Sequence, residues 1–294
     1  MDRLCIIADE VSSDFDHALA CASAWDLRYV EVHSLWDTSV EWLDTSQIER
    51  LRAALAAHHL SAPVISSTIF LRCRLQDGPP PERWSRRFDS LAGGYTEHLH
   101  ALERSLAVAH EVGAAVVRIF GFWRDGPTND TVVAQIVDRL RPALQMASAS
   151  GIVLALENCP HTYLDQTRLA LQVVRRLNSP WLRLLWDPAN ALRSGEADVA
   201  ERVDEALPVL AHMHLKGLRL AEETSAGREY VRLDQGGIDF RRLIGRLLDG
   251  GYAGLFSLEP HYSLAGEDRQ GAARESLVIV RDIFRTLRQP AGLT

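Results

Sequence analysis

Four side chains that can bind a metal ion stand at or near the ends of short apolar segments in the second half of the chain. Each belongs to a different segment: Glu157 in 152–157, Asp187 in 182–187, His214 in 211–216 and Glu259 in 254–259. Three carboxylates and one imidazole form a mainly oxygen-donor set, which suits Mn²⁺, Mg²⁺, Co²⁺ or Fe²⁺ better than a structural zinc ion. We predict one divalent metal site, with Mn²⁺ as the favoured ion.

Any one of these acidic residues has an ordinary explanation. An acidic side chain after an apolar run is more often a solvated strand end or a helix cap, and Asp187 is also suited to open a turn before Pro188. A whole set is harder to explain in this way. Unpaired carboxylates gathered in a partly desolvated site would cost several kcal/mol. The set therefore favours a metal site.

The segment 211–216 shows which histidine to choose. In a strand, alternate residues share a face, so His212, His214 and Lys216 lie on one side and Ala211, Met213 and Leu215 on the other. The apolar face should meet helices and the polar face the interior of a barrel. We expect His214 at the level of the other ligands, His212 one layer deeper, and Lys216, the only lysine of the chain, at the rim.

The elements that would position these residues alternate between short strands and longer helices along the chain. Strands are predicted at 4–8, 29–33, 62–67, 115–121, 152–157, 182–187, 211–216 and 254–259, and the clearest helices at 46–59, 95–112, 129–149, 166–178, 197–207 and 238–250. Thr45 and Ser46 can cap the helix at 46–59, and Gly113 and Gly151 fall just past two helix ends.

This order predicts a single α/β domain over residues 1–294, folded as a (β/α)8 TIM barrel. A doubly wound open sheet is the structural alternative. The barrel is favoured because no GxGxxG follows the first strand, and because the longest connections, 68–94 and 217–237, both follow strands. In a barrel those loops lie on the face where active sites form.

The composition of the chain argues against some classes of binding partner. A net charge of −7 argues against nucleic acid, and no apolar run is long enough to cross a membrane. The scattered cysteines and the absence of a signal-like start predict a cytoplasmic protein. The sequence leaves a homo-oligomer open.

Around the candidate ligands the sequence resembles the xylose-isomerase-like sugar phosphate isomerase/epimerase superfamily. The motifs that carry the resemblance read Leu156-Glu157-Asn158-Cys159-Pro160, Trp186-Asp187-Pro188-Ala189-Asn190, His214-Leu215-Lys216-Gly217 and Ser257-Leu258-Glu259-Pro260. The resemblance implies a mononuclear metal site acting on a small carbohydrate that bears a carbonyl. It also implies that Glu157 and Glu259 double as base and acid, and that Lys216 polarises a substrate oxygen or steadies its charge.

Further substrate-binding candidates come from the same segments and their neighbours. Asn158 and Asn190 belong to the motifs. Arg118, inside a predicted strand, either clamps substrate or neutralises a neighbouring charge. His33 is a candidate for substrate contact but is more simply explained as a core or surface histidine, and His161 either lines the pocket or packs.

Other functions remain to be weighed. Apurinic endonucleases of the same superfamily hold three metals, but Asn190, Arg228 and Tyr230 stand where further ligands would be required. A dehydratase of dehydroshikimate or inosose type begins with the same proton removal, and the residues do not separate it from an epimerase. A sugar-acid-binding protein or a partner-dependent subunit is the remaining, non-enzymatic alternative.

Overall fold

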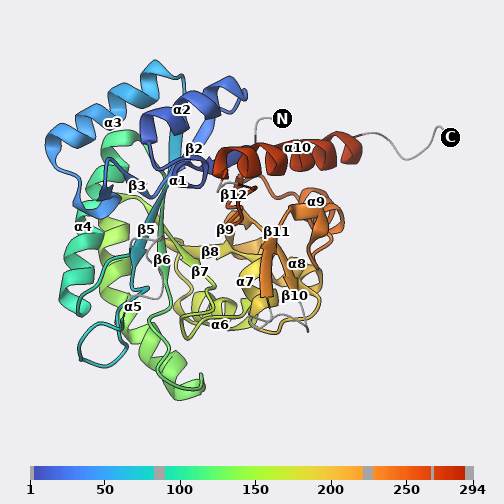
Figure 1. Ribbon diagram of the computed structural model, residues 1–294. Helices are drawn as coiled ribbons and strands as arrows, with labels where there is room; N and C mark the ends of the chain where they lie inside the picture. The colour runs from blue at the N-terminus through green and yellow to red at the C-terminus, as the bar shows by residue number, and fades with distance from the viewer. Residues whose placement is uncertain (1–2, 83–89, 221–227, 266–267, 289–294) are drawn as a thin grey trace.

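The centre of the computed structural model is a closed barrel of eight parallel strands (Figure 1). The structure describes residues 3–82, 90–220, 228–265 and 268–288. Around the barrel the strand order is β1 (Leu4–Ile7), β12 (Phe256–Leu258), β9 (Leu210–Leu215), β8 (Leu182–Trp186), β7 (Val153–Glu157), β6 (Val116–Phe120), β5 (Ser61–Ile69) and β2 (Tyr29–Val32). Each predicted strand overlaps one barrel strand, so the predicted TIM barrel is confirmed.

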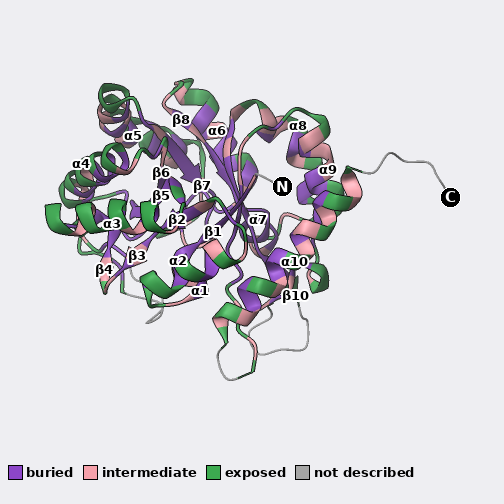
Figure 2. Cartoon of the chain, turned by 90° about the horizontal axis from the view of Figure 1, so that it is seen from above, coloured by how far each residue is buried: buried purple, intermediate pink, exposed green. Residues whose placement is uncertain are grey.

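Period-two alternation places apolar side chains outside the barrel and polar ones inside. Leu156, Trp186, Met213 and Leu215 belong to the apolar core between strands and helices. The alternate positions in β7 and β9 hold Glu157 and His214, which are also buried but face the interior. Figure 2 shows the consequence, with buried strands at the centre and exposed surface along the outer helices.

Helices surround the barrel and follow its strands. They are α1 (Ala8–Val11), α2 (Phe15–Ala24), α3 (Thr45–Ala57), α4 (Tyr95–Val112), α5 (Asp130–Ser150), α6 (Thr167–Leu177), α7 (Pro188–Arg193), α8 (Val203–Ala206), α9 (Phe240–Asp249) and α10 (Arg269–Leu287), with 3-10 turns η1 (Val40–Trp42), η2 (Val199–Arg202), η3 (Leu207–Val209) and η4 (Leu233–Gln235). The continuous helix predicted at 197–207 is instead split into η2, α8 and η3. Pro208 lies in η3 and has no amide hydrogen with which to continue an α-helix.

Helix ends follow the sequence with one correction. Gly113 and Gly151 end α4 and α5 in the left-handed conformation, with φ of 74° and 70°, as expected of glycine at these positions. The cap of α3 is neither Thr45 nor Ser46 but Asp44, whose carboxylate accepts from the Gln47 amide while Gln47 Oε1 accepts from the Asp44 amide. This reciprocal pair satisfies two backbone donors, which a lone hydroxyl cannot do.

The connections that follow β2 and β9 carry extra structure. A hairpin of β10 (Gly217–Leu220) and β11 (Arg228–Val231) follows β9 directly and is set apart from the barrel sheet. A second small hairpin, β3 (Ser34–Leu35) with β4 (Thr38–Ser39), follows β2. The β10–β11 hairpin carries Tyr230 to the mouth of the barrel, where it lines a cavity. Among the described residues, none of the helices is both long and apolar enough to cross a membrane.

Candidate metal centre

The barrel brings Glu157, Asp187, His214 and Glu259 together, with one ligand atom from each lying within 4.8 Å of the others. Glu157 ends β7, Asp187 follows β8, His214 is in β9 and Glu259 follows β12. These strands are neighbours in the barrel, and their register pairs Ser257 with His214 and Trp186 with Met213. The four side chains therefore reach one height at the carboxyl ends of the strands, and all four are buried.

The buried polar atoms of this cluster are suited to bind a metal ion. Asp187 Oδ2, His214 Nδ1 and Glu259 Oε2 are buried, and none of them has a partner with hydrogen-bond geometry. Both carboxylate oxygens share one cation, Lys216 Nζ, at ion-pair distance, and His214 Nδ1 lies 3.0 Å from Glu259 Oε2. Buried polar atoms usually have well-formed hydrogen bonds, because each has lost its hydration. Two carboxylate oxygens and an imidazole nitrogen facing one point are suitable ligands for a divalent metal ion.

His214 is oriented by a residue on the other side of the barrel. Its Nε2 lies 3.1 Å from Glu31 Oε1, so Nδ1 is the nitrogen that faces the cluster. Glu31, in β2, is itself held by the Ser66 hydroxyl and by His212 Nε2 at 3.0 Å. Burial opposes the charged imidazolium, but Glu31 and Glu259 outweigh this effect and raise the pKa of His214 well above its ordinary value. Carboxylate-bound histidine of this kind is typical of metal sites.

Lys216 lies deeper than the rim position that strand alternation suggested. Its side chain is 2% exposed, and Nζ lies 2.8 Å from Asp187 Oδ2 and 2.5 Å from Glu259 Oε2. Burial opposes its charge, but Asp187 and Glu259 outweigh the effect and raise the pKa of Lys216 well above its ordinary value. The single lysine of the chain is therefore a buried cation at the level of the candidate ligands.

The two glutamates have different surroundings. Glu157 accepts from Asn190 Nδ2 at 3.0 Å and from Arg118 Nη1 at 3.2 Å, and burial raises its pKa to about 6 against the effect of Arg118. Burial also opposes ionisation of Glu259, but Lys216, His261 and His214 hold its pKa well below the usual range. Two carboxylates with pKa values pushed apart are suited to acid and base roles.

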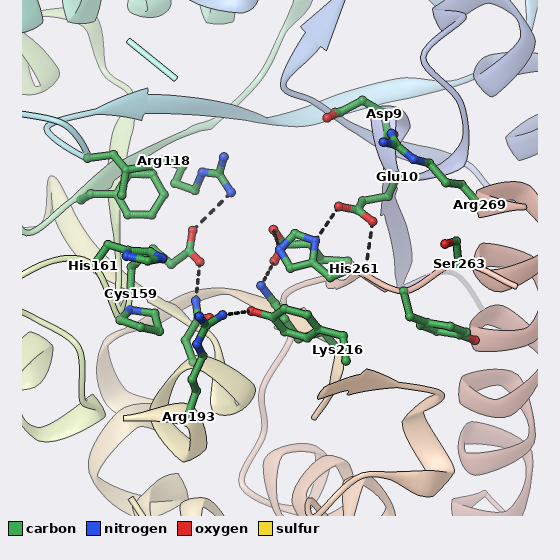
Figure 3. Close-up of a pocket in the computed structure, with 18 residues that line it drawn as sticks. Asp9, Glu10, Arg118, Cys159, His161, Arg193, Lys216, His261, Ser263 and Arg269 are labelled. Atoms are coloured by element: carbon green, nitrogen blue, oxygen red, sulfur yellow. Dashed lines mark hydrogen bonds and ion pairs between the residues drawn. The ribbon is translucent and has the colours of Figure 1, made fainter. Parts of the chain in front are cut away.

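A cavity of about 540 Å³ opens above the cluster and is lined by Glu157 and Glu259 (Figure 3). Arg118, Asn190, His161 and Lys216, all predicted from the sequence to take part in the site, also line it. Arg118 Nε and Nη2 donate to the carbonyls of Ser67 and Ser66, so its guanidinium is held rigidly beside Glu157. The ring of His161 stacks on Trp123 with an interplanar angle of 7°.

Two other predicted substrate-binding residues lie behind the cavity wall. Asn158 is fully buried and makes a two-way bond with the Asp187 backbone, through Nδ2 to the carbonyl at 2.8 Å and Oδ1 to the amide at 2.9 Å. His33 is 2% exposed, and its Nδ1 lies 3.1 Å from Asp9 Oδ2. Asn158 thus supports a candidate metal ligand and His33 supports Asp9, which lines the cavity, but neither Asn158 nor His33 is among the lining residues.

Several site residues were not found from the sequence. Glu31 is one, although alternation along Tyr29–Val32 places it on the same strand face as the predicted His33. Asp9, Glu10, Arg193 and His261 line the cavity from short helices and loops. His261 Nδ1 lies 2.7 Å from Glu10 Oε1, joining α1 to a residue 251 positions later in the sequence. No local pattern predicts such a pair.

The sequence profile of the xylose isomerase-like TIM barrel family matches residues 19–283 of this chain. Among curated proteins, the L-ribulose-5-phosphate 3-epimerase UlaE of Salmonella heidelberg (strain SL476) is 26% identical over 200 residues. That match covers 67% of this chain and 66% of the relative, so the chain spans just under two thirds of its length.

Solved structures share the fold at lower identity. The IolI protein with a bound zinc atom superposes with a TM-score of 0.75 at 15% identity, covering 97% of this chain and 99% of that one. A xylose isomerase-like protein from Mycobacterium smegmatis in complex with magnesium gives a TM-score of 0.69 at 19% identity, covering 93% and 89% of the two chains. At these identities the similarity concerns the barrel alone.

Proposed function

Because the chain belongs to the xylose isomerase-like TIM barrel family, we propose that it is a divalent-metal-dependent isomerase or epimerase acting on a small sugar or polyol-derived ketone. The observation that carries the proposal is the buried cluster of four candidate ligands beneath a cavity of substrate size, in which Asp187 Oδ2, His214 Nδ1 and Glu259 Oε2 converge without a partner of hydrogen-bond geometry. The epimerase activity of the UlaE relative supports the reaction class.

In this proposal Glu157, Asp187, His214 and Glu259 hold one metal ion, with Mn²⁺ as the favoured occupant. When bound, the ion polarises the carbonyl and the neighbouring hydroxyl of the substrate, which lowers the cost of removing a proton from the adjoining carbon. Oxygen-rich donor sets favour Mn²⁺ and Mg²⁺, while the imidazole also accommodates zinc. Reconstitution with each metal will identify the active form.

The proton transfers are assigned to Glu157 and Glu259. One carboxylate accepts the proton from the carbon next to the carbonyl, and the other, in its acid form, returns a proton to the opposite face or to the neighbouring carbon. The number of protons on the pair is the same before and after the reaction. Arg118 and Asn190 keep Glu157 in place, while Lys216 steadies negative charge on the substrate oxygen.

Deuterium exchange tests the proposal directly. Metal-loaded protein is incubated in D₂O with ketoses, inososes and dehydroshikimate, and NMR follows loss of the proton next to the carbonyl. We expect exchange with at least one compound, and a fall of about 10²- to 10⁴-fold in Glu157→Gln and Glu259→Gln. Appearance of a dehydrated product would instead identify a lyase.

The matched control is Glu41→Gln, which changes a buried glutamate that does not line the cavity. Metal content is measured on every variant, because Glu157 and Glu259 are also candidate ligands. Full exchange in either of those two variants, or no exchange with any compound by the metal-loaded protein, contradicts the proposed reaction.

A further inference from the structure

Most charged side chains around the mouth of the barrel are paired within the protein, but some of its arginines are not. Each acidic side chain around the cavity has a basic partner: Glu157 with Arg118, Asp187 and Glu259 with Lys216, Glu10 with His261, and Asp9 with His33. Two further arginines line the cavity and form no ion pair within the described part of the chain: Arg269, whose Nη1 donates to the Asp9 carbonyl, and Arg193. Of the two, Arg193 has a buried donor without an acceptor, so it is the stronger candidate to bind a ligand.

Arg193 is held in place by contacts that leave much of its binding capacity unused. Its Nη1 donates to the Tyr230 hydroxyl at 2.7 Å, and its guanidinium carbon lies 5.7 Å from the centre of the Tyr230 ring. Its Nε is buried and has no hydrogen-bond acceptor. By contrast, Arg124 nearby pairs with Asp165. A buried guanidinium donor without an acceptor is costly unless a ligand supplies one.

Tyr230 adds a second donor at the same place. Its hydroxyl oxygen accepts from Arg193, so its own proton is free to point at a ligand. Burial raises the pKa of Tyr230, although Lys216 and Arg193 oppose this, so the hydroxyl keeps its proton. Both side chains line the cavity, and in Figure 3 Arg193 lies on the opposite side of it from Asp9 and Arg269.

We propose that the ligand of this cavity carries an anionic group, a carboxylate or a phosphate, which binds to the Arg193 guanidinium and the Tyr230 hydroxyl. The planar guanidinium is suited to bind either group through two parallel hydrogen bonds. The proposal rests on the proposed function in one respect: the other end of the ligand would extend toward Glu157 and Glu259. It narrows the substrate class from small carbohydrates in general to sugar acids and sugar phosphates.

Unreactive polyols separate this proposal from the catalytic one. Calorimetry on the metal-loaded full chain compares ribitol, which is neutral, with ribonate and ribitol 5-phosphate, none of which has an aldehyde or ketone group. We expect at least one anionic probe to bind about 10- to 100-fold more tightly than ribitol. The anion whose affinity exceeds that of ribitol by more shows whether the site prefers a carboxylate or a phosphate.

Variants test whether Arg193 causes the preference. In Arg193→Ala the advantage of the anion should disappear while ribitol binds as before, and Arg193→Lys should restore part of it. Arg124→Ala, the matched control with a carboxylate partner, should keep the full preference. If Arg193→Ala binds none of the probes, Tyr230→Phe decides, because it keeps the ring and should weaken only the anions.

The inference is overturned if ribitol binds as well as both anions, or if the preference survives unchanged in Arg193→Ala and Tyr230→Phe. Its failure is distinct from failure of the proposed reaction. Anion preference without deuterium exchange would leave the anion site standing and remove the isomerase, whereas exchange without anion preference would do the reverse.

Discussion

Two groups of buried carboxylates lie in this barrel, and they differ in how their oxygens are satisfied. Glu41 is fully buried, yet it accepts from the Thr68 amide, the Thr68 hydroxyl and the Ser39 hydroxyl. In the candidate metal centre, Asp187 Oδ2 and Glu259 Oε2 are equally sheltered from water, but they share the Lys216 ammonium as ion pairs and have no partner with hydrogen-bond geometry. Glu41 has its hydrogen bonds within the protein, whereas the candidate ligands do not.

The comparison shows that burial of an acidic residue is a poor guide to its function. A carboxylate that receives enough donors is stable in the interior and has a structural role. Carboxylates that converge on one point without such donors are suited to bind a metal ion. The lack of hydrogen bonds, rather than the number of acidic residues, distinguishes the candidate metal centre from the surroundings of Glu41.

The largest expected difference between the two regions is in metal content. His214→Ala should reduce the bound metal from about one ion per chain to nearly none, because it removes one of four ligand side chains and the only imidazole among them. Elemental analysis after dialysis against Mn²⁺ measures the occupancy. Glu41→Gln should keep full occupancy; equal loss in both variants would show that the two regions are not distinct.

A smaller effect is expected from Glu31, which does not face the candidate ligands directly but orients His214. Glu31→Gln should weaken metal binding by about 10- to 100-fold without abolishing it, because the amide holds the imidazole less firmly and no longer favours its metal-binding tautomer. Competition with a fluorescent chelator measures the affinity. An affinity equal to that of the unchanged protein would remove Glu31 from the metal centre.

The smallest effect is a pH dependence of stability near Glu41. Two residues after Thr68, which donates to Glu41, the Phe70 amide donates to His98 Nδ1 at 2.9 Å. Burial, with a contribution from Arg72, lowers the pKa of His98 to about 3. The unfolded chain therefore binds this proton first as the pH falls. The contribution of neutral His98 to the free energy of unfolding is complete above about pH 6.5. Below that pH it declines by up to about 1.4 kcal/mol per pH unit.

Urea unfolding between pH 7 and pH 4.5 measures this slope. His98→Gln has no titrating group at this position, so its stability should decline less steeply than that of the unchanged protein. Identical slopes would show that His98 does not retain its neutral form through folding.

Much of the fold follows from short-range patterns. Alternation in strands, three- and four-residue spacing in helices and the glycines at 113 and 151 agree with the barrel and its helix ends. The helix predicted at 197–207 is wrong as a continuous element, because 3-10 turns replace its first and last parts and leave only Val203–Ala206 as an α-helix. The cap of α3 was misplaced by one residue because Asp44 and Gln47 satisfy each other.

The residue types and their positions at strand ends were enough to nominate Glu157, Asp187, His214 and Glu259, because parallel strands in a barrel end on the same face. The amino-acid order contains no information on which oxygens lack a well-formed hydrogen bond, how deep Lys216 lies or which arginines have no carboxylate partner. Those properties depend on contacts between residues remote in the chain, such as Glu31 with His214, 183 positions apart, and Arg193 with Tyr230. They arise only when the barrel closes and water is excluded from its mouth.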